Sequence, residues 1–360
     1  MKKFSFHLPL NSTSLGQVSF SILRELYSRD LEILLFPIGE IDVSSQEPNE
    51  KFFHWIQSSV VNGLKEHDKN NPVFKLWHIN GSLESFSDRQ FLLTFHELDS
   101  LTQTETNILK NNSKVLVSSN FSVDIFKEHG VDNVSYLPLF FDSSNFRRTN
   151  KTYFSDGRIT FNLCGKFERR KHHVKIIRTW INKYGNNSAY SLQCALYNNF
   201  LSQEDNTKMV NFSVDNKKFF NVNFFGYMAQ NSVYNELLNS ADIILGMSGG
   251  EGWGLPEFQS VALGKHSVIL NAHSYKSWAN SSNSTLVNPN AKTPVYDGMF
   301  FQQGLEYNQG NIFDWNENDF INACELAISK VKNNRVNEEG LKLQNDFSLK
   351  KTAHQILSLF

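Results

Sequence analysis

Cysteine and long apolar runs are scarce in this 360-residue chain. The three cysteines, Cys164, Cys194 and Cys324, are scattered, so they fit reduced thiols better than a disulfide framework or a zinc site. No segment approaches the roughly 20 apolar residues of a membrane span, and the opening MKKFSFHLPLNSTS lacks the apolar core of a signal peptide. We therefore expect a soluble, cytoplasmic protein with at most peripheral membrane contact.

An excess of charge of one sign is also missing. Lys and Arg number 35 and Asp and Glu 36, which gives a formal net charge of -1. This balance argues against a nucleic acid or an anionic membrane as the main partner. Hydrophobic residues make up 40% of the chain, and its length is enough for two domains, each with its own core.

The most informative stretch is ADIILGMSGGEGWGLPEFQSVALGKHSVIL, residues 241–270. Its pattern predicts a buried strand, a glycine-rich turn, a short helix that begins near Pro256, and a second strand. Glycines between a strand end and a helix start let backbone amides approach an anion, which the helix dipole also favours. The glycines alone are equally compatible with an ordinary tight loop between a strand and a helix.

Strand-like and helix-like segments alternate along the rest of the chain, which predicts an α/β protein with parallel sheets. A polar stretch without periodicity, residues 142–157, is the expected linker between two domains. The expected strands are residues 4–8, 31–36, 74–79, 91–95, 114–118, 134–139, 159–164, 191–197, 222–226, 242–245 and 267–270.

The segment EGWGLPEFQSVALG resembles the donor-site motif of retaining GT-B glycosyltransferases of the family 4-like group (glycosyl transferases group 1). Residues 251–256 match the opening of that motif. The family closes the motif with a second Glu, whereas this chain has Gln259 there, and the nearest acid, Glu257, comes two residues earlier. A neutral Gln can still accept and donate hydrogen bonds, but it should bind a nucleotide more weakly than a carboxylate.

The resemblance implies the GT-B architecture, in which two doubly wound, Rossmann-like domains face each other across a cleft. Residues 1–150 would form the acceptor-side domain and residues 151–340 the domain that binds the nucleotide sugar. Residues 341–360 would form a terminal helix that packs back on the first domain.

A basic turn follows the strand expected at 159–164. By itself such a run is usually a solvated loop, but Gly165, Lys166 and Lys171 fit the family pattern G-[RK]-x4-K. The resemblance implies that both lysines neutralise the donor diphosphate, with help from the backbone amides of Gly254 and Leu255. We expect Arg169 and Arg170 to be exposed.

The resemblance also assigns roles around the sugar and the nucleotide. Glu251 would bind sugar hydroxyls and stabilise charge that develops at the anomeric carbon, and Gln259 would contact the ribose. Tyr227 and Met228, after the strand at 222–226, would line the base pocket, unless they are plain loop residues. The turn His273-Ser274-Tyr275-Lys276 would lie near the sugar.

Two expected sites lie in the first domain. His96 and Glu97 follow the strand at 91–95 and would reach the sugar or the acceptor, although a lone His is more often structural. Gly16 would approach the donor phosphates together with Gln17. The alternative for this loop is a plain helix start capped by Ser14.

These expectations describe a retaining hexosyltransferase that uses a UDP-, GDP- or ADP-sugar and a glycan, lipid-linked or other hydroxyl acceptor. No D-x-D motif is present, so we expect no metal and no cofactor besides the donor substrate. One alternative is a GT-B phosphorylase or epimerase, because the fold alone does not fix the chemistry. A non-catalytic sugar-nucleotide or glycan-binding protein is another, which Gln259 favours. Glucosylation of DNA bases is disfavoured by the near-neutral charge.

Overall fold

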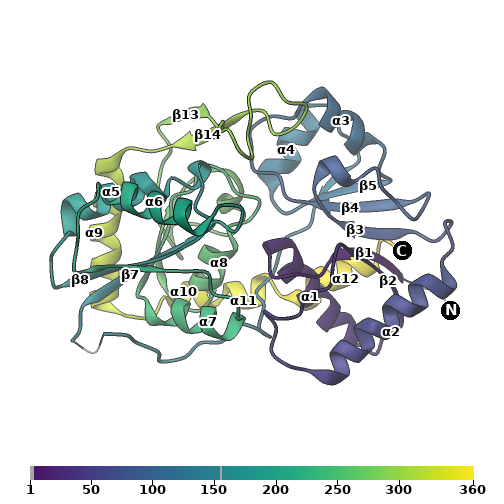
Figure 1. Cartoon of the computed structure of the whole chain (residues 1–360), viewed down its shortest axis with the longest axis horizontal. Coiled ribbons are helices and arrows are strands. Elements are labelled where there is room, and N and C mark those ends of the chain that lie inside the picture. The colour runs from purple at the N-terminus through teal and green to yellow at the C-terminus, as the bar shows by residue number, and fades with distance from the viewer. Residues whose placement is uncertain (1–3, 155) are drawn as a thin grey trace.

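Figure 1 shows two α/β domains side by side in the computed structural model, which describes residues 4–154 and 156–360. Within these residues each domain contains one parallel six-stranded sheet flanked by helices. Most strands are short, largely apolar runs that are buried on both faces, as expected for parallel sheets covered by crossover helices, while the edge strands β6 and β9 are partly exposed. The predicted pair of doubly wound, Rossmann-like domains is therefore confirmed.

The first sheet has the strand order β2-β1-β3-β4-β5-β6. Its strands are β1 (Phe4–Pro9), β2 (Ile33–Ile38), β3 (Val73–Leu76), β4 (Gln90–Thr94), β5 (Lys114–Val117) and β6 (Val134–Tyr136). The helices between them are α1 (Ser14–Ser28), α2 (Glu50–Glu66), α3 (Gln103–Lys110) and α4 (Asn120–Glu128). The strand expected at 74–79 ends at Leu76, because the chain turns into a short 3-10 helix at Ile79–Gly81.

The second sheet has the order β12-β11-β10-β7-β8-β9. Its strands are β7 (Ile159–Gly165), β8 (Tyr190–Leu196), β9 (Val222–Phe225), β10 (Ile243–Gly246), β11 (His266–Leu270) and β12 (Thr285–Val287). Its helices are α5 (His173–Tyr184), α6 (Gln203–Ser213), α7 (Asn231–Ser240), α8 (Leu255–Ala262) and α9 (Glu317–Asn333). The strand order reverses between β7 and β10, and ligands of doubly wound sheets bind outside the carboxyl ends of the strands at such a point.

After α9 the chain returns to the first domain through α10 (Glu338–Leu341), α11 (Leu343–Asp346) and α12 (Leu349–Leu357). In Figure 1 this yellow segment crosses from the second domain to the first, where α12 lies beside α1. The ring of Phe360 lies 5.2 Å from that of Phe4 and 5.7 Å from that of Phe6. The last residues of the chain thus complete the core of the first domain.

The sequence pattern did not predict the antiparallel hairpin of β13 (Ala291–Pro294) and β14 (Asn311–Asp314). The loop between its strands reaches the first domain near α3 (Figure 1). There Thr102 Oγ1 donates a hydrogen bond to the carbonyl of Glu306 at 2.6 Å, and Lys292 at the base of the hairpin pairs with Asp99 at 2.8 Å.

Among the residues described, no helix combines the length and the apolar character that crossing a membrane requires.

Candidate active site

Two loops of the second domain meet where the strand order reverses. One follows Gly165 at the end of β7 and contains a short 3-10 helix, Arg169–Lys171. The other is the glycine-rich loop of residues 247–254, which follows Gly246 at the end of β10 and leads into α8. The backbone amide of Gly249 donates to the carbonyl of Arg170 at 2.9 Å, so the two loops are joined directly.

A buried ion pair connects these loops. Lys171 Nζ donates a hydrogen bond to Glu251 Oε1, and Arg170 Nη1 lies 3.3 Å from Glu251 Oε2. Glu251 is only 6% exposed. Burial alone would raise the pKa of Glu251, but the charges of Lys171 and Arg170 outweigh burial and hold this pKa far below its ordinary value. Burial opposes the charge of Lys171 as well, and Glu251 more than compensates, so the pKa of Lys171 is raised.

Arg170 corrects one expectation, because it is buried rather than exposed. Its guanidinium lies 2.5 Å from Glu168 Oε1 and 3.0 Å from Glu97 Oε1, and it donates to the carbonyl of Gly250. Arg169 is exposed, as predicted. Successive side chains of a 3-10 helix point about 120° apart, so neighbours in a run of basic residues can face the site or the solvent. Nothing in the sequence pattern distinguishes Arg170 from Arg169.

Lys166 does not join Lys171 in this conformation. Its ammonium pairs with Glu168 Oε2 at 3.1 Å and lies over the ring of Phe300, 3.9 Å from the ring centre. Phe300 belongs to the loop of the β13–β14 hairpin, which the sequence did not reveal. The two lysines of the expected motif therefore flank Glu168 and Arg170 instead of forming one cluster.

The glycine-rich loop packs against the first domain at van der Waals distance. A Cβ atom built on Gly250 would lie 2.2 Å from the carbonyl oxygen of Glu97, which leaves no room for a side chain. At the next glycine, Gly252, the carbonyl accepts a hydrogen bond from Ser118 Oγ at 2.5 Å. Glu97 and Ser118 follow β4 and β5, so both domains contribute the carboxyl ends of their strands to the site.

Helix α8 points its amino terminus at this loop. Gly254 is its N-cap residue, with a φ of +80° that strongly favours glycine, and no side chain caps the helix there. The amides of the first turn, including that of Leu255, are therefore free of a side-chain cap, as an anion site requires. Gln259 lies one turn further along, buried, with Nε2 3.5 Å from the carbonyl of Phe140 and with Oε1 without a hydrogen-bond partner.

The two candidates after β4 take different positions. Glu97 reaches the second domain and pairs with Arg170. Burial and the carboxylates of Glu168 and Glu251 raise the pKa of Glu97, while Arg170 opposes them. His96 is buried inside the first domain, with its ring 5.2 Å from that of Phe126, and burial lowers its pKa to about 4. Its surroundings are those of a neutral structural histidine.

The remaining candidates lie at the edges of the site. Tyr227 follows β9, is 47% exposed and lies 6.3 Å from the ring of Tyr197, whereas the neighbouring Met228 packs against the main core. Helix α1 begins at Ser14, so Gly16 lies in its first turn. Gln17 Oε1 accepts a hydrogen bond from Asn231 Nδ2 of the second domain at 2.8 Å.

The turn after β11 belongs to the site more firmly than its loose motif suggested. His273 Nε2 lies 2.8 Å from the carbonyl of Ser248, and burial lowers the pKa of His273 to about 4. The ring of Tyr275 packs against Gly254, where a Cβ would come within 2.2 Å of Tyr275 Cε1. Both side chains therefore contact the glycine-rich loop.

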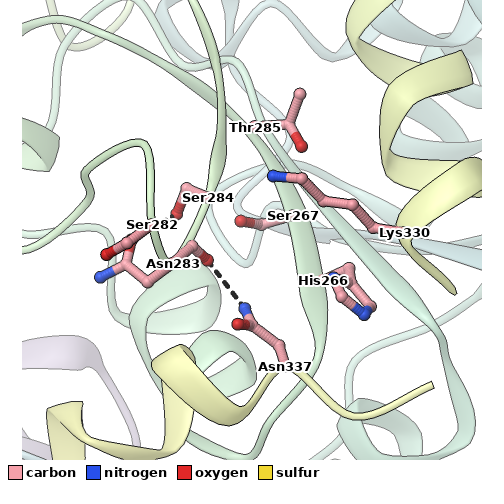
Figure 2. A pocket seen from close by; sticks show the side chains of 8 residues that line it. All are labelled: His266, Ser267, Ser282, Asn283, Ser284, Thr285, Lys330 and Asn337. Atoms are coloured by element: carbon pink, nitrogen blue, oxygen red, sulfur yellow. Dashed lines mark hydrogen bonds between the residues drawn. The ribbon is translucent and has the colours of Figure 1, made fainter. Parts of the chain in front are cut away.

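A polar cavity of about 50 Å3 lies elsewhere (Figure 2). His266 and Thr285, which line it, begin β11 and β12, so the cavity is at the amino ends of the strands and away from the switch point. In Figure 2 the side-chain amide of Asn337 donates a hydrogen bond to the backbone carbonyl of Asn283 at 2.7 Å.

In residues 4–154 and 156–360 no group of three or more His, Cys, Asp or Glu side chains is arranged to hold a metal ion.

The overall structure is similar to those of solved glycosyltransferases. Sucrose-phosphate synthase from Thermosynechococcus elongatus superposes with a TM-score of 0.68 at 12% identity, over 99% of this chain and 98% of that one. A glycosyltransferase from Rickettsia africae gives 0.66 at 14% identity, over 100% and 98% of the chains. HepE from Anabaena, solved with UDP-glucose, gives 0.64 at 14% identity, over 99% and 98%.

At these identities the likeness establishes the GT-B fold, and the fold alone. The chain matches no protein-family model and no curated protein sequence at a significant level.

Proposed function

We propose that this protein is a retaining glycosyltransferase of the family 4-like type. It would move a hexose from a nucleoside-diphosphate sugar to a hydroxyl acceptor such as a glycan or a lipid-linked glycan. The observation that carries the proposal is the buried pair of Lys171 and Glu251 at the switch point, beside the amino terminus of α8. This arrangement places positive charge, helix amides without a side-chain cap and the carboxylate of Glu251 within a single buried region.

Each group has a part in the proposed transfer. Lys171, Arg170 and the amides at Gly254 and Leu255 would hold the diphosphate and neutralise its charge as it leaves. Glu251 would exchange its bond with Lys171 for hydroxyls of the sugar and for the charge at the anomeric carbon. Glu97 comes from the first domain and would face the acceptor side.

The chemistry balances without a protein nucleophile. The bond between the anomeric carbon and the diphosphate oxygen breaks, and its electron pair leaves with the diphosphate. The acceptor oxygen forms the new bond on the same face of the sugar, and its proton passes to the departing phosphate. No pair of catalytic carboxylates of the glycosidase type is needed for this step.

The nucleotide would lie along the second domain. Gln259 would contact the ribose, and Tyr227 with Met228 would border the base. Lys166 would move from Glu168 and Phe300 to the diphosphate when the donor binds, and Gly16 would approach the same phosphates. HepE was solved with UDP-glucose, and we propose a UDP-, GDP- or ADP-sugar as the donor here.

Product analysis tests the proposal. Purified protein is incubated with each sugar nucleotide and a panel of sugar and lipid-linked acceptors, and released nucleoside diphosphate and glycosylated product are measured by mass spectrometry. We expect equal amounts of both, an unchanged anomeric configuration by NMR, and full activity in excess chelator. Inverted product would overturn retention, loss of activity in chelator would overturn metal independence, and epimerised or phosphorolysed sugar would overturn the transferase itself.

A further inference from the structure

Glu257 is a buried carboxyl beside the candidate diphosphate site that the proposed transfer does not use. It lies in the first turn of α8, two residues before the position where the family motif places its acid. The side chain is 4% exposed, and no cation among the described residues binds its carboxyl directly. The Tyr275 hydroxyl is close enough to interact with this carboxyl, although the geometry of a full hydrogen bond to Oε2 is not reached. A buried carboxyl without a cation of its own is costly to ionise.

Gly246 at the end of β10 and Gly254 in the glycine-rich loop make space for this carboxyl. A Cβ built on Gly246 would lie 2.7 Å from Glu257 Cγ, and one built on Gly254 would lie 3.1 Å from Glu257 Oε2. The carboxyl is therefore turned back toward the N-cap residue of its own helix. It occupies the end of α8 where free amides and the helix dipole favour negative charge.

The groups around Glu257 come from five elements. Glu251 lies in the glycine-rich loop, Lys171 in the turn after β7, Tyr275 in the turn after β11, Cys164 in β7 and Tyr234 in α7. A small pocket between Glu257 and Lys171 is also lined by His173 and Ser248. Only Lys171 is a cation among the nearest groups, and Glu251 already binds it.

Burial, followed by the charge of Glu251, raises the pKa of Glu257 to about 7. Its neighbours do not titrate near neutrality, because the pKa of Cys164 is raised to about 12 and those of Tyr275 and Tyr234 are raised well above their ordinary value. Burial keeps His173 neutral by lowering its pKa. Glu97, across the domain interface, is the other acid at the site whose pKa is raised.

We propose that the donor diphosphate binds together with a proton on Glu257, so that this residue couples donor affinity to pH. The inference rests on the proposed function. A diphosphate at the amino terminus of α8 and a carboxylate at the same place repel each other. The neutral carboxyl instead has a hydrogen to donate to a phosphate oxygen. Glu257 is thus a positioning residue that accepts the diphosphate only in its protonated form.

Donor binding and protonation of Glu257 are thermodynamically linked, so the direction in which donor affinity changes with pH is fixed. Donor binding raises the pKa of Glu257 further, so the complex takes up a proton where free Glu257 is ionised. Affinity should be constant well below pH 7 and should fall as the pH rises above it, by at most about tenfold per pH unit. A sugar nucleotide is the right probe, since free phosphate monoesters titrate near pH 6 and would mask the effect.

The test is calorimetry with UDP-glucose, or with another sugar nucleotide where a thermal-shift panel selects it, from pH 6.0 to 8.5. Each pH is measured in two buffers of different ionisation enthalpy, which gives the protons taken up. We expect the wild-type affinity to fall at least about fivefold between pH 6.5 and 8.5, with proton uptake at pH 8. Glu257→Gln should show a flat profile without uptake, and Glu97→Gln should keep the wild-type slope.

The outcomes separate this inference from the proposed function. Tight binding with a flat wild-type profile, or the same slope in Glu257→Gln as in wild type, overturns the role of Glu257 alone. A slope that disappears in Glu97→Gln transfers the effect to that residue and overturns it as well. Failure of every sugar nucleotide to bind at pH 6, in wild type and in Glu257→Gln, overturns the proposed function and this inference with it. Melting temperatures check that both variants fold.

Discussion

Lys171 and Glu251 come from loops 80 residues apart and form a buried hydrogen-bonded ion pair where the strand order of the second sheet reverses. Each charge would be costly to bury alone, and the pair offsets that cost while it keeps both groups ionised. In the proposed function the cation of this pair would bind a phosphate and its carboxylate would bind a sugar.

Glu251→Gln should separate binding from turnover. The variant removes the charge that holds Lys171, so nucleoside-diphosphate binding should be unchanged or tighter. Turnover should fall by about two to three orders of magnitude, because a neutral amide cannot stabilise the charge at the anomeric carbon. Calorimetry and product formation measure the two effects. A variant with wild-type turnover would remove Glu251 from the chemistry.

Gly250→Ala should keep the domains apart. Its new Cβ would lie 2.2 Å from the backbone carbonyl oxygen of Glu97. Neither atom belongs to a flexible side-chain end, so a rotamer change cannot relieve the clash. We expect a larger radius of gyration in small-angle scattering and a loss of turnover. Donor binding to the second domain should persist, since the residues of the diphosphate site are unchanged. Wild-type dimensions together with wild-type turnover would show that the loop moves to accept the methyl group.

Gln259→Glu should cost stability in the free protein. Gln259 Nε2 faces the carbonyl of Phe140, and a carboxylate there would be buried against another acceptor. The free energy of unfolding should decrease by about 1–3 kcal/mol without nucleotide. A bound ribose would supply donors, so nucleotide affinity should rise. Turnover that appears only in this variant would instead favour a non-catalytic sugar-nucleotide-binding parent.

The free energy of unfolding should decrease in mild acid because His96 is buried in its neutral form. Its pKa in the unfolded chain is about 6.5 and burial lowers it to about 4 in the folded protein, so the unfolded state binds the proton more readily. The stabilising effect of neutral His96 is complete above pH 6.5 and is lost as the pH falls toward 4, by about 3 kcal/mol. Denaturant unfolding of wild type and His96→Gln measures the difference. Parallel pH profiles would contradict a buried neutral His96.

The sequence was a good guide to the fold because its signals are local. Short apolar strands, helix starts and the glycine-rich turn before α8 all follow from neighbouring residues, whereas Lys171 and Glu251 were assigned to one site only by the resemblance to the family motifs. Long-range packing left no comparable signal. The burial of Arg170 depends on carboxylates from both domains, and the position of Phe300 over Lys166 depends on a hairpin whose strands have four residues each.

The orientation of the Glu257 side chain could not be predicted from the sequence either. The sequence revealed an acid two residues early in a motif, but only the packing against Gly246 and Gly254 shows that its carboxyl turns back to the start of α8. The motif also gave no reason to separate His96 from Glu97, although one points into the first domain and the other reaches the second. Side-chain direction after a strand end depends on loop geometry, which residue type alone does not determine.

Donor binding tests the account most directly. Melting temperatures are measured with UDP-, GDP-, ADP- and dTDP-sugars for wild type, Lys171→Ala and the control Lys218→Ala, whose lysine is exposed shortly before β9. At a hundredfold excess over Kd, binding should stabilise the native state by about 2.7 kcal/mol. The account predicts a shift with one nucleotide base in wild type and Lys218→Ala, and none in Lys171→Ala. No shift with any donor, or an equal shift in Lys171→Ala, would contradict it.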